Sequence, residues 1–163
     1  MARDAEKVKK TNAMRELENH GVSYQVKTYE VDEDDLSGVH AAEVLGEDAS
    51  QVFKTLVTQS PDKQYAVFMI PVDEELSLKK AAAAAKHKSL SMIQVKELKS
   101  VTGYIRGGCS PLAMKKSFPV YIDETAQLFD TIACSGGQRG VQLIVNPEDL
   151  ARVVGAEFVD LLA

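Results

Sequence analysis

One lysine interrupts an apolar, strand-like run of the sequence. Lys54 follows Phe53 and precedes Thr55 within residues 52–57, and strand alternation places its side chain on the face opposite to theirs. A lysine in this position either extends to water and protects an exposed sheet edge, or provides a fixed cation at the mouth of a site. Such a cation would hold a phosphate or a developing oxyanion. The residue type alone leaves both alternatives open.

A glycine-rich segment, residues 103–112, breaks the helix and strand patterns and contains Gly107-Gly108. Adjacent glycines let the backbone approach a ligand closely and present N–H groups to an oxygen atom. The segment has neither the Walker spacing nor the G-x-G-x-x-G spacing of nucleotide-binding loops. A tight connection that binds no ligand explains its composition equally well.

A second glycine-rich segment, residues 135–140, lies between two predicted strands and includes Ser135, Gly136 and Arg139. The alternative that needs no ligand is a hairpin turn with glycines at positive φ. As part of a site, Ser135 would bind a polar group of a ligand, and Arg139 would pair with a carboxylate or a phosphate.

The sequence has few side chains suited to thiol or metal chemistry. Cys109 and Cys134 lie outside any C-x-x-C pattern, and the histidines are scattered. These spacings predict neither a disulfide framework, nor a metal site, nor a cofactor. Cys109 is a candidate nucleophile, but a small buried cysteine is more typical of a core residue.

Composition limits the class of protein. The chain has 163 residues, of which 45% are hydrophobic, and carries a net charge of −5 with a pI of about 5.2. No stretch is long and apolar enough to span a bilayer and no secretory signal is present, so we expect a cytoplasmic protein. Because nucleic-acid affinity comes largely from neutralised phosphates, we expect weak binding to RNA without a partner. The most basic predicted element is the helix that contains Lys79, Lys80, Lys86 and Lys88, for which a solvated face is the alternative.

The elements that must position these residues follow from periodicity, capping residues and turn residues. Predicted helices begin after Thr11, near Val39, after Ser77, at Gln94 and at Pro147, and predicted strands cover residues 23–31, 51–60, 64–72, 120–123, 131–135 and 140–146. This order predicts an α/β (α+β) fold with a mixed, largely antiparallel, barrel-like sheet surrounded by helices. We expect a flexible charged N-terminus over residues 1–10 and one domain over residues 11–163.

Taken in order, the motifs resemble the YbaK/EbsC family of cysteinyl-tRNA(Pro) deacylases, which are related to the editing domain of bacterial prolyl-tRNA synthetases. The resemblance runs from about Thr11 to Leu162, and its most specific part is F-K-T at 53–55 followed by G-G-x-S-P-L and S-G-G-x-R-G. Further matching pieces are Thr28-Tyr29, Ala41-Ala42, Leu78-Lys79-Lys80-Ala81-Ala82, Thr102-Gly103-Tyr104 and Gly155-Ala156.

The resemblance implies the family's mixed α/β barrel-like fold and an essential lysine, which by motif position is Lys54. It points to a substrate pocket, whose predicted residues here are Tyr29, Thr55, Gly107, Gly108, Ser135, Gly136 and Arg139. It also implies a reaction without metal or protein nucleophile, in which the thiol of the substrate cysteine attacks its own ester. The implied partners are the aminoacylated 3′ end of tRNA and prolyl-tRNA synthetase, which selects the tRNA.

Two positions depart from the commoner pattern of the family. Arg106 adds a charge beside Gly107, and Ser37 stands where relatives often carry a larger side chain. Both leave the amino-acid preference open. The alternatives are a deacylase for another small amino acid, such as alanine, that uses water, and a non-catalytic module that binds a synthetase or tRNA.

Overall fold

The computed structural model describes residues 2–3 and 8–163. In chain order the elements are β1 (Ala2–Arg3), α1 (Asn12–Asn19), β2 (Tyr24–Tyr29), α2 (Gly38–Leu45), η2 (Ala49–Gln51), β3 (Phe53–Gln59), β4 (Tyr65–Pro71), α3 (Leu78–Ala85), β5 (Ser91–Met92), α4 (Val95–Thr102), β6 (Val120–Asp123), η3 (Glu124–Leu128), β7 (Ile132–Ser135), β8 (Val141–Val145), α5 (Pro147–Val154) and β9 (Glu157–Val159). All the helices and strands predicted from the sequence are present.

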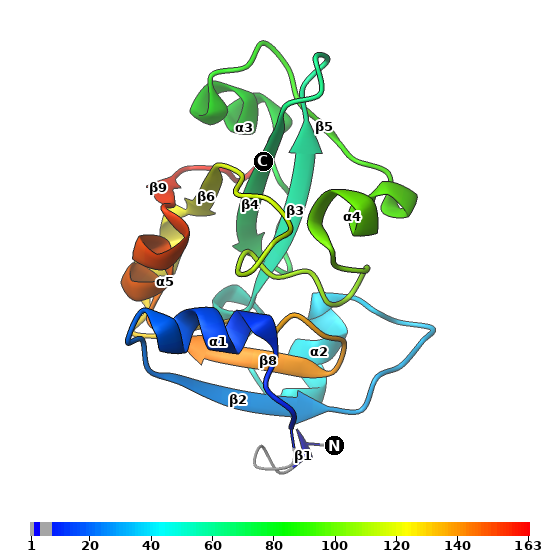
Figure 1. Ribbon diagram of the computed structural model, residues 1–163, viewed down its shortest axis with the longest axis vertical. Helices are drawn as coiled ribbons and strands as arrows, with labels where there is room; N and C mark the ends of the chain where they lie inside the picture. Colours follow the sequence, from blue (N-terminus) through cyan, green and yellow to red (C-terminus); the bar gives the residue numbers. More distant parts are fainter. Residues whose placement is uncertain (1, 4–7) are drawn as a thin grey trace.

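The strands form two sheets (Figure 1). A four-stranded antiparallel sheet has the order β1-β2-β8-β7, and a mixed five-stranded sheet has the order β5-β3-β4-β6-β9. In the second sheet β6 is parallel to both β4 and β9, and β3 is antiparallel to β4 and β5. The largely antiparallel prediction is therefore confirmed for this mixed α/β fold.

The two sheets do not close into a barrel, which corrects one detail of the predicted fold. They are joined by one parallel bridge between Val52 and Ala133. Beyond this bridge β3 pairs with β4 from Phe53 to Gln59 and β7 pairs with β8. Residues of both β3 and β7 line a cavity at this point, so side chains and open space replace the backbone hydrogen bonds that closure would require.

Side-chain caps fix where the helices begin. The hydroxyl groups of Thr11 and Ser77 accept hydrogen bonds from the backbone N–H groups of Met14 and Lys80, at 3.2 Å each, as expected for N-cap residues. Helix α2 has a similar cap, because Ser37 Oγ accepts from the His40 N–H at 3.2 Å. The sequence analysis treated Ser37 as a pocket residue and did not identify this cap.

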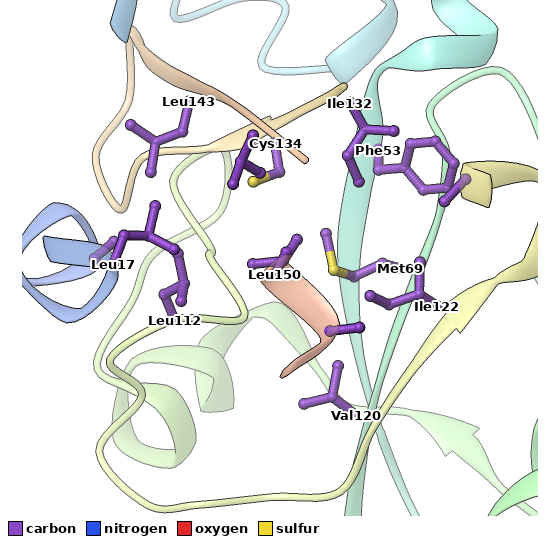
Figure 2. Packing of buried hydrophobic residues seen from close by; sticks show 14 of the residues in the cluster. Leu17, Phe53, Met69, Leu112, Val120, Ile122, Ile132, Cys134, Leu143 and Leu150 are labelled. Carbon is purple, nitrogen blue, oxygen red and sulfur yellow. The ribbon is translucent and has the colours of Figure 1, made fainter. Parts of the chain in front are cut away.

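The main hydrophobic core draws on both sheets and on helices α1 and α5 (Figure 2). Leu17 of α1, Met69 of β4, Leu143 of β8 and Leu150 of α5 all have an exposed fraction of 0%. A second cluster, which includes Phe68 and Leu161, packs α3 and the C-terminal segment against β4 and β6. This packing holds β3, β7 and β8 in place around the cavity.

The hydrophobic pattern of the sequence does not predict the shortest helices and strands. Strands β5 and β9 and the 3-10 helices η2 and η3 lack a full period of the hydrophobic pattern. The predicted flexible segment 1–10 falls in part on residue 1 and residues 4–7, which lie outside the described residues. Ala2–Arg3, within the same range, pairs with Tyr29 and Thr28 of β2. The division into this segment and one domain stays a prediction.

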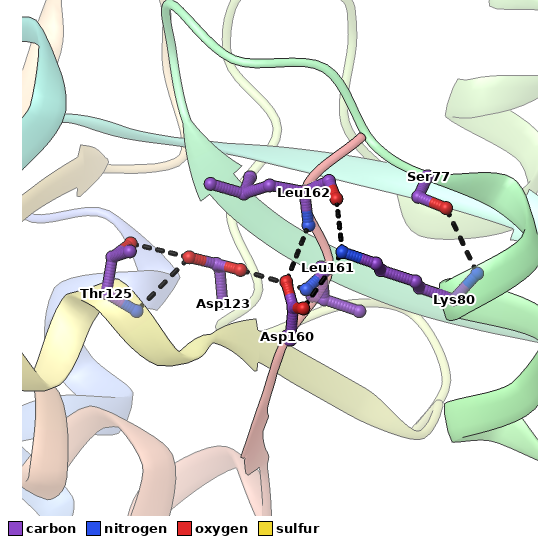
Figure 3. Close-up of polar contacts among 7 residues, drawn as sticks. All are labelled: Ser77, Lys80, Asp123, Thr125, Asp160, Leu161 and Leu162. Atoms are coloured by element: carbon purple, nitrogen blue, oxygen red, sulfur yellow. Dashed lines mark hydrogen bonds and ion pairs between the residues drawn. The ribbon is translucent and has the colours of Figure 1, made fainter.

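A buried carboxylate fixes the C-terminal segment (Figure 3). Asp123 is 0% exposed, and its Oδ1 accepts a hydrogen bond of 2.9 Å from the Leu161 N–H. Its Oδ2 accepts from the N–H and the hydroxyl of Thr125, at 3.1 and 2.5 Å. The carboxylate thus joins the end of β6, the start of η3 and the chain after β9.

Replacing this carboxylate tests its structural role. Asp123→Ala leaves two backbone N–H groups without a partner, so we expect the free energy of unfolding in urea to fall by about 3 kcal/mol. Glu124→Ala removes an exposed carboxylate next to it and should change stability by no more than about 0.5 kcal/mol. Equal stabilities of the two variants would contradict the role of Asp123.

Candidate functional site

A cavity of about 370 Å³ opens between β3, α2, α4 and the two glycine-rich turns. Residues of β2, β7 and β8 complete its walls. Of the predicted site residues, five line it: Tyr29, Lys54, Thr55, Gly107 and Ser135. Its lining is mostly apolar, and none of the lining residues is an aspartate or a glutamate. The cavity is within the size range of small-molecule sites, roughly 300–1,000 Å³.

Lys54 supplies a partly dehydrated cation to this cavity. Its ammonium group donates a hydrogen bond of 3.3 Å to the Val72 carbonyl. Burial lowers the pKa of Lys54, while the nearby carboxylates of Glu75, Asp73 and Glu74 act in the opposite direction. Since an ammonium group has three donors, the cation keeps donors for a ligand. Of the two alternatives that the sequence left open, the structure places Lys54 at the cavity, where it pairs with Ile70 of β4; β5 pairs only with the other end of β3, at Thr58 and Gln59.

Two cavity residues carry buried polar atoms without a hydrogen-bond partner. They are Thr55 Oγ1 and Gln142 Oε1, and the Gln142 residue is only 4% exposed. An unpaired buried polar atom costs about 1–3 kcal/mol, so a protein retains one chiefly where something else pairs with it. Because both residues line the same cavity, they are candidates to bind a polar group of a ligand.

The sequence analysis missed Gln142. The sequence feature that could have identified it is a polar residue within an otherwise apolar strand, Val141–Val145. In the structure, Gln142 of β8 pairs with Ser135 of β7. The analysis also did not assign wall residues in α2 and α4, such as Ala41 and Leu98. These are ordinary core residue types, so only the three-dimensional arrangement identifies them.

The two glycine-rich turns pack directly against each other. A Cβ atom on Gly108 would lie 3.1 Å from the Arg139 nitrogen and 3.2 Å from the Gln138 carbonyl carbon. Gly107 has a φ of +87°, a conformation that side chains rarely adopt. The Gly108 N–H donates to the Ile105 carbonyl at 3.0 Å, so it is not available to an oxyanion. The Gly107 N–H is therefore the better candidate of the predicted pair.

Arg139 holds these turns together. Its Nε donates a hydrogen bond of 2.8 Å to the Arg106 carbonyl, and its Nη1 lies 3.2 Å from Glu33 Oε2. Arg139 and Gly108 are thus placed behind the cavity wall rather than in it. Gly136 is also outside the lining, and a Cβ there would lie 2.6 Å from Val141 Cγ1. Direct contact of these three residues with a substrate stays a prediction.

The thiols and the phenol of the cavity favour their neutral forms. Burial raises the pKa of the Cys109 and Cys134 thiols to about 12 each, and it also raises the pKa of Tyr29. A thiol with this pKa is a poor nucleophile, because the thiolate is the reactive form. Within residues 2–3 and 8–163, no group of His, Cys, Asp and Glu side chains is arranged to hold a metal ion. No helix in that part of the chain is long and apolar enough to cross a bilayer.

Comparison with known proteins places this site in a family. The model of the aminoacyl-tRNA editing domain matches residues 36–153. The chain belongs to the aminoacyl-tRNA editing domain family. The matched range contains Lys54, Thr55, Gln142 and both glycine-rich turns, whereas Tyr29 lies just before it.

Two relatives carry names related to editing. A protein of Enterococcus faecalis (strain ATCC 700802 / V583), provisionally named Cys-tRNA(Pro)/Cys-tRNA(Cys) deacylase EbsC, is 43% identical over 152 residues, which are 93% of each chain. A proline–tRNA ligase of Shouchella clausii (strain KSM-K16) is 31% identical over 104 residues, which are 64% of this chain and 18% of the ligase. The editing domain thus corresponds to a small part of that synthetase.

Solved structures share the fold of this editing domain. A structure described as a candidate trans-editing enzyme for prolyl tRNA synthetase has a TM-score of 0.79 at 22% identity and covers 93% of this chain and 95% of its own. The hypothetical protein APE2540 has a TM-score of 0.85 at 20% identity, over 94% of this chain and 100% of its own. At these identities the likeness concerns the fold.

Replacing Gln142 tests whether its unpaired oxygen serves a ligand. Gln142→Leu keeps the size and removes the polar group, so we expect an unchanged or higher melting temperature. The kcat/KM for aminoacylated tRNA should fall roughly tenfold, because a hydrogen bond to the substrate is lost. Gln25→Leu, at an exposed position of β2, is the matched control. Full activity of Gln142→Leu would contradict the assignment.

Proposed function

We propose that this chain is a trans-editing deacylase that removes cysteine from cysteinyl-tRNA(Pro). The observation that carries the proposal is a small cavity with one half-buried lysine and unpaired polar atoms, but no ionised nucleophile among the residues that line it. The similarity to EbsC over 93% of each chain supports cysteine as the amino acid. The similarity to a proline–tRNA ligase supports proline tRNA.

The substrate would supply its own nucleophile. The cysteine sulfur attacks the ester carbonyl carbon, a C–S bond forms, and the C–O bond to the terminal ribose breaks. The thiol proton passes to the ribose oxygen, and the amino acid leaves as a cyclic thiolactone. Because the attack is intramolecular, the effective concentration of the nucleophile is high and the protein mainly has to orient the substrate.

The cavity residues would stabilise the charges that this reaction creates. The Gly107 N–H would donate to the carbonyl oxygen as negative charge grows on it, which the position of Gly107 in the cavity lining supports. Lys54 would hold the phosphate of the terminal nucleotide or stabilise the leaving ribose oxygen. Thr55, Ser135 and Gln142 would bind the polar groups of the aminoacyl moiety, and Tyr29 would close the cavity beside Ser37.

The proposal includes prolyl-tRNA synthetase as a partner and neither metal nor cofactor. A net charge of −5 disfavours tight binding of RNA by this chain alone. A synthetase that already holds proline tRNA would raise the local concentration of the substrate. Such an arrangement would also provide the tRNA selectivity.

Removal of Lys54 tests the site. Lys54→Ala should lower the rate of cysteine release from cysteinyl-tRNA(Pro) about a hundredfold or more, because a preorganised charge in the cavity is lost. Its melting temperature should stay the same or rise, since a half-buried cation no longer loses hydration. Lys79→Ala, on exposed α3, controls for loss of a positive charge. Unchanged release by Lys54→Ala would remove this residue from the reaction.

Blocking the substrate thiol tests the mechanism. S-methylcysteinyl-tRNA(Pro) and alanyl-tRNA(Pro) should not be deacylated, whereas cysteinyl-tRNA(Pro) should be. The reason is that a methylated sulfur has no proton to give to the leaving oxygen, and alanine has no sulfur. Release of either amino acid at a comparable rate would establish water as the nucleophile. No release from any substrate by the folded protein would favour a binding module.

A further inference from the structure

The mouth of the cavity has an acidic side. The loop before α2 carries Glu30 and Asp32–Asp35, and the turn after β4 carries Asp73–Glu75; all of these carboxylates are exposed. Both segments adjoin wall residues, because Leu36, Ser37 and Val72 line the cavity. A phosphate backbone entering from this side would be repelled.

The part of the mouth formed by α4 and the loop after it is basic. Residues 94–116 comprise α4 and the loop that follows it, and their exposed charged residues are Lys96, Lys99, Arg106, Lys115 and Lys116. The acid in this segment is Glu97, which is partly buried. None of these five cations has an ion-pair partner within the described residues. The net charge of this segment is thus positive, whereas that of the whole chain is negative.

This basic segment reaches the cavity itself. Gln94, Val95 and Leu98 of the α4 region and Arg106 of the following loop are wall residues. Lys115 lies at the other end of α4, where its N–H donates to the Thr102 carbonyl at 3.0 Å. A second hollow, of about 440 Å³, lies beside Lys115 and Tyr104. The cations of residues 94–116 therefore belong to the same segment as these wall residues, and α4 lies beside β3 (Figure 1).

Exposed apolar side chains accompany the cations. Met92, Val95 and Ile105 are 43%, 61% and 46% exposed, and they are three of the five exposed large apolar side chains of the described residues; the other two, Leu78 and Leu128, lie elsewhere. Apolar surface beside positive charge suits a single-stranded RNA end, whose bases pack on side chains while its phosphates pair with cations.

We propose that residues 94–116 form the docking face for the acceptor end of tRNA. The 3′-terminal nucleotide lies against Met92, Val95 and Arg106, and the RNA leaves the cavity along α4 toward Lys99, Lys115 and Lys116, away from the acidic side. This inference rests on the proposed function, since it assigns the path of that substrate. It differs from the sequence-based choice of α3 as the most positive element.

Helix α3 serves as the internal comparison. None of its residues lines the cavity. Lys80 is paired with Asp160 at 2.8 Å and with the Leu162 carbonyl at 2.7 Å, so its charge holds the C-terminal segment (Figure 3). The other lysines of this region, Lys79, Lys86 and Lys88, are exposed and offer a matched set of charges.

A triple variant tests the face. The test variant removes three positive charges at positions that do not line the cavity: Lys99→Gln/Lys115→Gln/Lys116→Gln. The control variant removes three positive charges from the α3 region: Lys79→Gln/Lys86→Gln/Lys88→Gln. Binding is measured by fluorescence anisotropy with tRNA(Pro) that carries no amino acid, at several salt concentrations. Activity is measured with two substrates, cysteinyl-tRNA(Pro) and the cysteinyl ester of adenosine.

For the first variant we expect tRNA affinity to fall roughly tenfold or more, and the slope of log K against log salt to become shallower by about 2 to 3. The KM for cysteinyl-tRNA(Pro) should rise by a similar factor, and turnover of the adenosine ester should be unchanged. Wild-type affinity and slope in this variant, or equal losses in the α3 control, would overturn the proposal. If wild type cleaves neither substrate, the proposed function fails, and the anisotropy measurements still decide whether this face binds RNA.

Discussion

The position of β3 between the two sheets is the constraint on which the site depends. The strand is paired with β4 along its whole length, and Val52, the residue just before it, forms a bridge to Ala133 of β7. The side chains that follow must then lie where the sheets part. Lys54 and Thr55 therefore both contribute to the cavity wall although their side chains leave the strand on opposite faces, and the cavity follows from the incomplete closure of the sheets.

The site is preorganised at some cost to stability. Lys54 is partly dehydrated, and Thr55 and Gln142 hold buried polar atoms that nothing in the described chain satisfies. The surrounding structure stabilises this arrangement: the two glycine-rich turns pack on each other, and Arg139 joins them to Glu33. Polar residues that line the cavity are thus held in position by a rigid surrounding structure. This arrangement is typical of sites that act by orienting the substrate and by electrostatic stabilisation.

The sequence predicted the elements well where the signal was local. Thr11 and Ser77 identify helix starts because their hydroxyl groups cap backbone N–H groups, and alternation around Lys54 identifies β3. The motifs around Lys54, Gly107 and Ser135 also converge on one cavity. Features that depend on contacts between residues distant in the sequence could not be predicted from local patterns. The open junction of the sheets depends on pairing between distant strands, and Gln142 becomes conspicuous only when its oxygen is found buried without a partner.

In the proposed reaction, the aminoacyl end of the substrate occupies the cavity beside Lys54. The most direct measurement is a crystal structure with cysteine joined by a stable amide to 3′-amino-3′-deoxyadenosine. We expect the cysteinyl group between β3 and β8, with its polar atoms hydrogen-bonded to Thr55 and Gln142. The Lys54 ammonium group should lie near the ribose or its 5′ oxygen, and the adenine should lie against α4. An analogue bound outside the cavity, for instance in the hollow beside Lys115, with Gln142 still unpaired, would contradict it.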